Sequence, residues 1–160
     1  MRKKAERRPR VVPLAEGDRI PRSVRLRLRW LRRRRKTGVL LHWTMRTGYR
    51  AVTLKWSIVS VELGGTTLGS LGSPQFCDSR FIGLPPGSHD LGLRVIRGRR
   101  SRGTYCEQTV DLAPGDIFLA LCEPVQPDVF YRKSPVEDTW QLRLVTSDEG
   151  AGVSAHDVKD

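Results

Sequence analysis

Turn-forming residues interrupt short apolar segments about every 8–12 residues between residues 38 and 145. Three of these turns are Gly64-Gly65, Pro85-Pro86-Gly87 and Ala113-Pro114-Gly115. Between the turns, apolar and polar residues alternate, as in residues 89–95, and this is the period of a strand with one buried face. No stretch in this region has the period of a long helix. The pattern predicts an all-β fold, a single small antiparallel β-sandwich.

Two of the expected strands carry more specific information. Residues 39–45, VLLHWTM, are almost continuously apolar, which is typical of a strand covered on both faces. In residues 51–63 the apolar alternation changes phase between Ile58 and Val59, so we expect a bulge or a change of sheet there. Gly64-Gly65 then closes a hairpin. The remaining expected strands cover residues 66–71, 75–83, 89–95, 104–112, 117–122, 129–131 and 140–145.

The turn motifs of residues 52–123 resemble those of PEGA-type domains and their β-sandwich relatives. The matching features are the hairpin glycines, the strand Leu68-Gly69-Ser70-Leu71, the turn and strand of residues 85–91, and the turn at residues 113–115. The sequence departs from the family at the hairpin, where Gly64-Gly65 replaces the usual Asp-Gly. The resemblance implies a small Ig-like or transthyretin-like sandwich that serves as an accessory or interaction module. It transfers no catalytic residue, because turn motifs specify backbone geometry rather than chemistry.

The composition divides the chain into three parts. Residues 1–21 contain three prolines and many charges, which predicts a basic arm that is disordered by itself. Residues 22–146 are expected to form the sandwich. Residues 147–160, acidic and rich in glycine and alanine, are expected to form a disordered tail. The chain has no signal-peptide pattern and no window near the roughly 18 apolar residues of a membrane span. We therefore expect a cytoplasmic protein without an integral membrane segment.

The positive charge is confined to one end of the chain. Residues 1–36 hold 16 lysines and arginines against three acidic residues, a net charge of +13. Residues 37–160 hold 13 lysines and arginines against 14 acidic residues, a net charge of −1. Such an asymmetry indicates a polyanionic partner, namely RNA, DNA or an anionic surface, or else an acidic protein surface. Solvated charge without a partner is the alternative interpretation.

The densest part of this charge lies in residues 22–36, RSVRLRLRWLRRRRK. Apolar residues and arginines alternate here, which favours a half-buried strand. Its apolar face would hold Val24, Leu26, Leu28 and Trp30. Its other face would hold Arg25, Arg27 and Arg29 about 6.6 Å apart, a spacing suited to following a phosphate backbone. The same row of charges would also protect a sheet edge from aggregation without any partner.

A helix is the alternative for the same segment. Val24, Leu28 and Leu31 have helical spacing, and arginine and leucine are good helix formers. Ser23 would then cap the start of the helix. The run of alternating residues favours the strand, but the sequence leaves both interpretations open.

The candidate polyanion-binding residues are all basic. They are Arg25, Arg27, Arg29, Arg32, Arg33, Arg34, Arg35, Lys36, Arg99, Arg100 and Arg102. The last three belong to a basic loop framed by glycines at residues 97–103. Trp30 and Trp43 have side chains able to stack on bases, but core positions are expected for both.

The sequence carries no recognisable catalytic or metal-binding motif. Cys77, Cys106 and Cys122 form no CxxC pair, and buried free thiols are expected. A Cys77–Cys106 or Cys106–Cys122 bridge is the alternative. His89 and Asp90 are adjacent in an expected strand, so their side chains point to opposite faces, and His89 is expected to make a local turn contact. We expect no cofactor, no metal site and no enzymatic activity.

These expectations combine into one hypothesis and two alternatives. The favoured function is a non-catalytic interaction module that contacts a polyanion, with a nucleic-acid backbone as the first choice, through its basic N-terminal segment. One alternative is a structural or accessory subunit that binds a protein in a larger assembly or at the cell envelope. The other is an enzyme whose site the sequence does not reveal.

Overall fold

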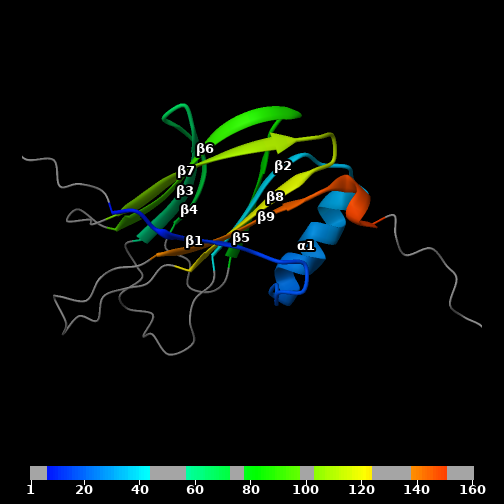
Figure 1. Cartoon of the computed structure of the whole chain (residues 1–160), viewed down its shortest axis with the longest axis horizontal. Coiled ribbons are helices and arrows are strands. Elements are labelled where there is room, and N and C mark those ends of the chain that lie inside the picture. The colour runs from blue at the N-terminus through cyan, green and yellow to red at the C-terminus, as the bar shows by residue number, and fades with distance from the viewer. Residues whose placement is uncertain (1–6, 44–56, 73–77, 98–102, 124–137, 151–160) are drawn as a thin grey trace, which may run out of the picture.

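A computed structural model of the chain describes residues 7–43, 57–72, 78–97, 103–123 and 138–150. Nine strands, one α-helix and one 3-10 turn are described (Figure 1). In chain order they are β1 (Arg10–Pro13), α1 (Arg22–Arg33), β2 (Gly38–Trp43), β3 (Ser57–Leu63), β4 (Thr66–Gly72), β5 (Asp78–Gly83), β6 (Gly87–Arg97), β7 (Thr104–Leu112), β8 (Ile117–Glu123), β9 (Thr139–Val145) and η2 (Ser147–Gly150).

The strands form two sheets that pack face to face, which confirms the all-β sandwich. The larger sheet has the order β1-β9-β8-β2-β5, and the smaller has the order β4-β3-β6-β7. Most neighbours are antiparallel, as predicted, but β2 pairs with β8 in parallel and β1 pairs with β9 in parallel. Parallel neighbours need a long connection. Here the whole smaller sheet lies between β2 and β8 in the sequence.

The main core lies between the two sheets. In β6, Leu91, Leu93 and Val95 alternate toward it, as the sequence pattern predicts. Val59 and Val61 of β3 lie beside them in the same cluster. The larger sheet contributes buried residues from β2, β8 and β9, which are Val39, Leu41, Trp43, Phe118, Ala120, Cys122, Trp140 and Leu142.

A second core lies on the outer face of the larger sheet, where α1 packs across it (Figure 1). Val24, Leu28 and Leu31 of α1 belong to one buried cluster with Leu40 and Leu119 of the sheet. Every residue of β2 is buried, because one face of this strand points toward the smaller sheet and the other lies under α1. This arrangement confirms that the continuous apolar run is a strand covered on both faces.

The strand expected at residues 23–31 is wrong, because the segment is a helix. Its three buried residues, Val24, Leu28 and Leu31, follow helical spacing, whereas the alternating partners Leu26 and Trp30 are exposed. The alternating pattern gave the wrong prediction because only half of its apolar residues are buried. The expected serine cap is also absent, since Pro21 occupies the N-cap position and no side chain caps the helix.

The segment expected to be a disordered arm contains β1. Arg10–Pro13 pairs with β9, and Leu14 joins the core under α1. Arg7 forms a single parallel bridge with Thr104 at the edge of the smaller sheet. Beside that bridge, the Thr104 hydroxyl donates to the buried Asp138 carboxylate (2.6 Å). The N-terminal segment therefore contacts both sheets, a long-range pairing that local composition does not encode.

The predicted hairpin is found, and the described cysteines form no disulfide. Gly64 and Gly65 turn between β3 and β4 with positive φ values of 55° and 80°, which confirms the hairpin. The register shift of β3 lies between Val61 and Glu62 rather than at the predicted Ile58-Val59. Cys106 and Cys122 are not in a disulfide, so neither proposed bridge forms, and Cys77 lies outside the described residues. The predicted strand at residues 129–131 lies outside the described residues. Of the tail predicted to be disordered at residues 147–160, Ser147–Gly150 forms η2, and the rest lies outside the described residues.

Candidate polyanion-binding site

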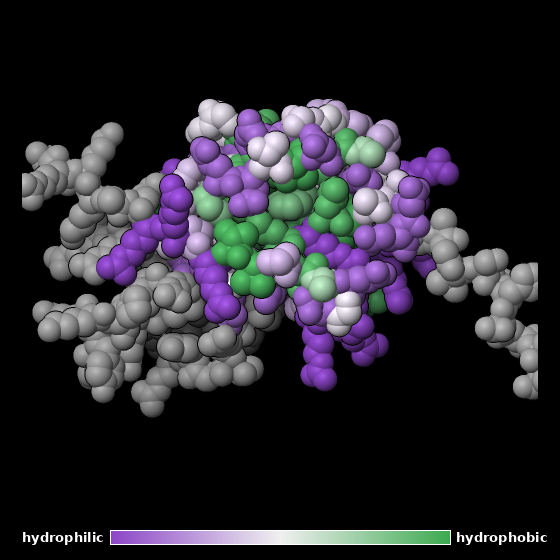
Figure 2. All heavy atoms as spheres, in the orientation of Figure 1, coloured by the Kyte–Doolittle hydropathy of each residue, from purple (hydrophilic) through white to green (hydrophobic). Residues whose placement is uncertain are grey.

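The basic residues of α1 and the turn after it form one uncompensated positive surface, which we call the α1 surface. Residues 22–36 contain eight arginines and Lys36 and no acidic residue. All nine side chains are exposed except that of Arg32, which is half-buried. Within the described part of the chain, none of them forms an ion pair with a carboxylate. Figure 2 shows long hydrophilic side chains projecting around α1 at the lower right of the molecule.

The helix separates the three arginines that a strand would have aligned. Neighbours two residues apart on a helix lie about 200° apart around its axis, so Arg27 points away from Arg25 and Arg29, which lie only about 40° apart. Arg25 lines a cavity beneath one flank of α1. Arg27 lies on the opposite flank and donates to the carbonyl and hydroxyl oxygens of Ser79 on β5 (2.5 and 3.1 Å). Only Arg29 points away from the sheet, and the predicted row of three is wrong.

A different set of residues forms the outward face of α1. Opposite the buried face lie Arg22, Arg29 and Arg33, spaced seven and four residues apart, or about 10 and 6 Å along the axis. Leu26 and Trp30 lie among them with 55% and 49% of their surface exposed. Trp30 is therefore not the core residue that the sequence predicts, whereas Trp43 is fully buried as predicted. Sequence reasoning also missed Arg22, which helical spacing from Arg29 would have found.

The turn after α1 adds further positive charge in a strained conformation. The backbone amide of Lys36 donates to the Leu31 carbonyl (3.1 Å), and that of Arg35 donates to the Arg32 carbonyl (2.9 Å). This pair of bonds is the Schellman pattern, in which glycine usually occupies the left-handed position. Arg35 occupies it here with φ of 49°, at a cost of about 1 kcal/mol relative to glycine. A cation thus stands where local stability favours glycine.

Arg32 and Arg34 have partners within the molecule. Arg32 donates to the carbonyl oxygens of Thr146 and Ser147 (3.3 and 3.5 Å), which ties the end of α1 to the end of β9. The Arg34 guanidinium lies over the ring of Trp30, 4.1 Å from its centroid. The predicted Arg99, Arg100 and Arg102 lie outside the described residues. The free part of the α1 surface therefore consists chiefly of Arg22, Arg29, Arg33, Arg35 and Lys36.

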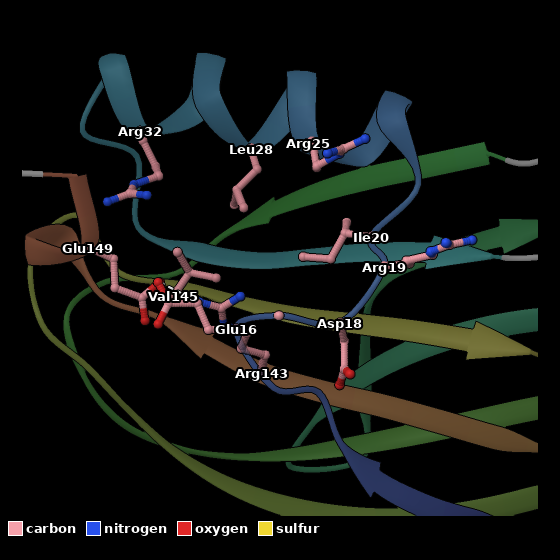
Figure 3. Close-up of a pocket in the computed structure, with 11 residues that line it drawn as sticks. Glu16, Asp18, Arg19, Ile20, Arg25, Leu28, Arg32, Arg143, Val145 and Glu149 are labelled. Atoms are coloured by element: carbon pink, nitrogen blue, oxygen red, sulfur yellow. Dashed lines mark hydrogen bonds and ion pairs between the residues drawn. The ribbon is translucent and has the colours of Figure 1, made fainter. Parts of the chain in front are cut away.

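A cavity of about 610 Å³ lies between α1, residues 16–20 and the end of β9 (Figure 3). Its apolar lining consists of Ile20, Leu28 and Val145, and its charged lining of four arginines and three carboxylates. Among the lining residues, Arg143 of β9 pairs with Glu149 of η2 (2.7 Å). These groups can hold a small charged molecule. None of the described lining residues is a serine, cysteine, histidine or lysine, so the cavity offers no such nucleophile.

The polar side chains of His89 and Asp90 are engaged in local contacts. His89 Nε2 bonds the Pro85 carbonyl (2.7 Å), which confirms the predicted turn contact, while Asp90 accepts from Thr109 (2.7 Å). Burial raises the pKa of Cys106 to about 11, so its thiol is protonated at neutral pH and is a weak nucleophile. Among the described residues, no three potential metal ligands lie together.

One polar cluster occupies the outer face of the smaller sheet. Arg94 pairs with Glu62 (2.9 Å) and lies over the Tyr105 ring, 4.6 Å from its centroid. The Tyr105 hydroxyl donates to Glu107 (2.9 Å), and partial burial and this hydrogen bond both raise the pKa of the phenol. The ring covers Gly92, where a Cβ atom would lie 2.8 Å from the hydroxyl oxygen. These polar side chains provide one another with hydrogen-bond and charge partners, and the Tyr105 ring shields the backbone at Gly92.

The α1 surface is thus the largest concentration of unpaired charged groups in the described part of the chain. The helices described there include none that is long and apolar enough to cross a membrane. The turns at Gly64-Gly65, Pro85-Pro86-Gly87 and Ala113-Pro114-Gly115 connect strands of the sandwich as the PEGA-type resemblance implies, but many sandwiches use such turns. Comparison of the chain with models of protein families, with curated proteins and with solved structures finds no match, so this resemblance stays a prediction.

Proposed function

We propose that the protein is a non-catalytic interaction module that binds the phosphate backbone of a nucleic acid through the α1 surface. The observation that carries the proposal is the run of nine basic side chains in residues 22–36, none of which forms an ion pair with a described carboxylate. A phosphate backbone supplies many negative charges in a row. Binding it would neutralise these side chains and release the counterions that both partners hold.

The way α1 is held supports this role. Its apolar residues Val24, Leu28 and Leu31 are used in packing on the sheet, so Arg22, Arg29 and Arg33 are presented on a helix that is fixed to the sandwich. Fixing the helix in advance lowers the entropy lost on binding. Contacts of this kind recognise phosphates rather than base sequence, so we expect little sequence preference.

A second candidate function is that of an accessory subunit with an acidic protein partner. Tryptophan and arginine are enriched in the energetically dominant centres of protein interfaces. Trp30 is half exposed and lies among arginines, so it fits that pattern as well. The two candidates differ in what remains bound when nucleic acid is destroyed.

Purification of the tagged full-length chain from its native cells, with and without nuclease, tests the proposal. We expect nucleic acid to co-purify and to be lost after nuclease treatment or a high-salt wash, because phosphate contacts are screened by salt. The variant Arg22/Arg29/Arg33→Ala serves as the control and should retain much less nucleic acid. A single protein retained in stoichiometric amount after nuclease treatment, with no bound nucleic acid before it, would favour the accessory subunit instead.

A further inference from the structure

We propose that the α1 surface binds unpaired nucleic acid in preference to duplex, because Trp30 stacks on an unpaired base. This inference rests on the proposed function and adds the class of nucleic acid. It starts from the position of Trp30, whose side chain is 49% exposed on the outward face of α1 among basic residues. An indole in such a position contributes nothing to the core and is free to meet a ligand.

The environment of Trp30 leaves part of the indole accessible. The Arg34 guanidinium lies over the indole, 4.1 Å from the ring centroid, so it covers one face. The side chain is still 49% exposed, so the ring keeps surface that Arg34 does not cover, and the proposal places the base on its other face. A base stacked on this face would complete an arginine–indole–base stack. The guanidinium also holds the ring in place before a base arrives.

The neighbouring residues supply the other contacts that a single strand needs. Arg29 and Arg33 lie next to Trp30 along the helix and are exposed, so they can hold the phosphates on either side of a stacked base. Leu26, one turn earlier, is 55% exposed and extends the apolar platform. Alternation of a stacking ring with cations is the general arrangement by which proteins bind single strands without sequence preference.

Duplex cannot make the same contact along its length. In the interior of a duplex each base face is already covered by its neighbours, and only base edges are accessible in the grooves; an open face remains only at the two ends. Trp30 is fixed on a helix that is packed against the sheet, so it would need to unstack a base pair to reach a face. Duplex would then be held by phosphates alone.

An anionic membrane surface fits the α1 surface less well. Helices that bind membranes bury a broad apolar face in the lipid interface. The apolar face of α1 is buried against the sheet, and its outward face offers only Leu26 and Trp30 between cations. Vesicles containing an anionic lipid therefore serve as a separate arm of the test.

The test compares a fluorescently labelled dT12 strand with a 12-base-pair duplex in binding to the full chain and three variants. Trp30→Ala should weaken binding of dT12 by about 5- to 150-fold, the usual effect of losing one stacked base, and change duplex binding less than about twofold. Trp30→Phe should keep most of the affinity because it keeps a ring. Leu26→Ala, the control for loss of exposed apolar area on the same face, should have a small effect.

Quenching of Trp30 fluorescence gives a second reading. Trp43 and Trp140 are fully buried, and Trp56 can be replaced with phenylalanine, so dT12 should quench the exposed indole while duplex should not. If dT12 and duplex bind equally, and Trp30→Ala leaves both unchanged, the inference is wrong and the proposed function stands. If the wild-type chain binds neither, both are wrong. Trp30-dependent binding to anionic vesicles but not to dT12 would identify a membrane surface instead.

Discussion

Replacing Arg22, Arg29 and Arg33 with glutamate is expected to weaken binding to single-stranded nucleic acid at least about 100-fold. The three side chains are exposed on the outward face of α1 and form no described ion pair. The substitution changes six units of charge at the site, and one pair of unit charges 4 Å apart interacts by about 1 kcal/mol in water. Screening by salt reduces the summed electrostatic energy, but a loss of about two orders of magnitude in affinity is still expected. Fluorescence anisotropy at about 100 mM salt measures the effect.

A matched control separates the α1 surface from net charge. The substitution Arg7/Arg8/Arg10→Glu changes the charge by the same amount at three exposed residues. These residues lie at the end of the β1 segment farther from α1 (Figure 1). We expect this control to lose less than about tenfold in affinity, through long-range electrostatics alone. Equal losses in the two variants would mean that α1 is not the site, and circular dichroism should show that both variants are folded.

Replacing Gly38 with alanine is expected to lower the free energy of unfolding by at least about 3 kcal/mol. Gly38 has φ of 153°, which L-residues rarely adopt, and an added Cβ atom would overlap the carbonyl oxygen of Ile82. It would also lie 3.0 Å from the Cα atom of Gly83, so backbone rather than a flexible side chain would have to move. β2 lies between β5 and β8, and its displacement disturbs both cores.

Urea unfolding followed by circular dichroism measures this loss, and Gly64 provides the control. Gly64 also has a positive φ, of 55°, but a Cβ atom there would meet nothing within 4 Å. Gly64→Ala therefore carries the backbone strain without the overlap and should cost about 1 kcal/mol. A Gly38→Ala protein as stable as Gly64→Ala would contradict the close approach of β2 and β5 at this position.

The strands were predictable because their signals are local. Alternation in residues 89–95, the turns rich in glycine and proline, and the continuous apolar run of β2 each depend on neighbouring residues. The pairing of β1 with β9 was not predictable, because it joins residues far apart in the chain and β1 has only four residues. The parallel pairing of β2 with β8 has the same origin.

The segment that carries the candidate site was evident from the sequence, but its conformation was not. The charge of residues 22–36 is evident from composition, so the segment could be identified. Its conformation could not, because Leu26 and Trp30 complete an alternating pattern although both are exposed. Exposed apolar side chains break the rule that apolar residues mark the buried face. Leu26 and Trp30 therefore made the helix hard to predict from the sequence. The same two residues give the α1 surface exposed apolar groups among its basic side chains.

The salt dependence of binding tests the central claim most directly. The affinity of the wild-type chain for dT12 should be measured between about 50 and 200 mM salt, beside that of Arg22/Arg29/Arg33→Ala. If the α1 surface holds phosphates, the logarithm of the binding constant should fall linearly with the logarithm of salt concentration. Each phosphate that the variant no longer neutralises should flatten the slope by about 0.7, so its slope should be smaller by about 2. Parallel lines for the two proteins, or wild-type binding that does not depend on salt, would contradict the account.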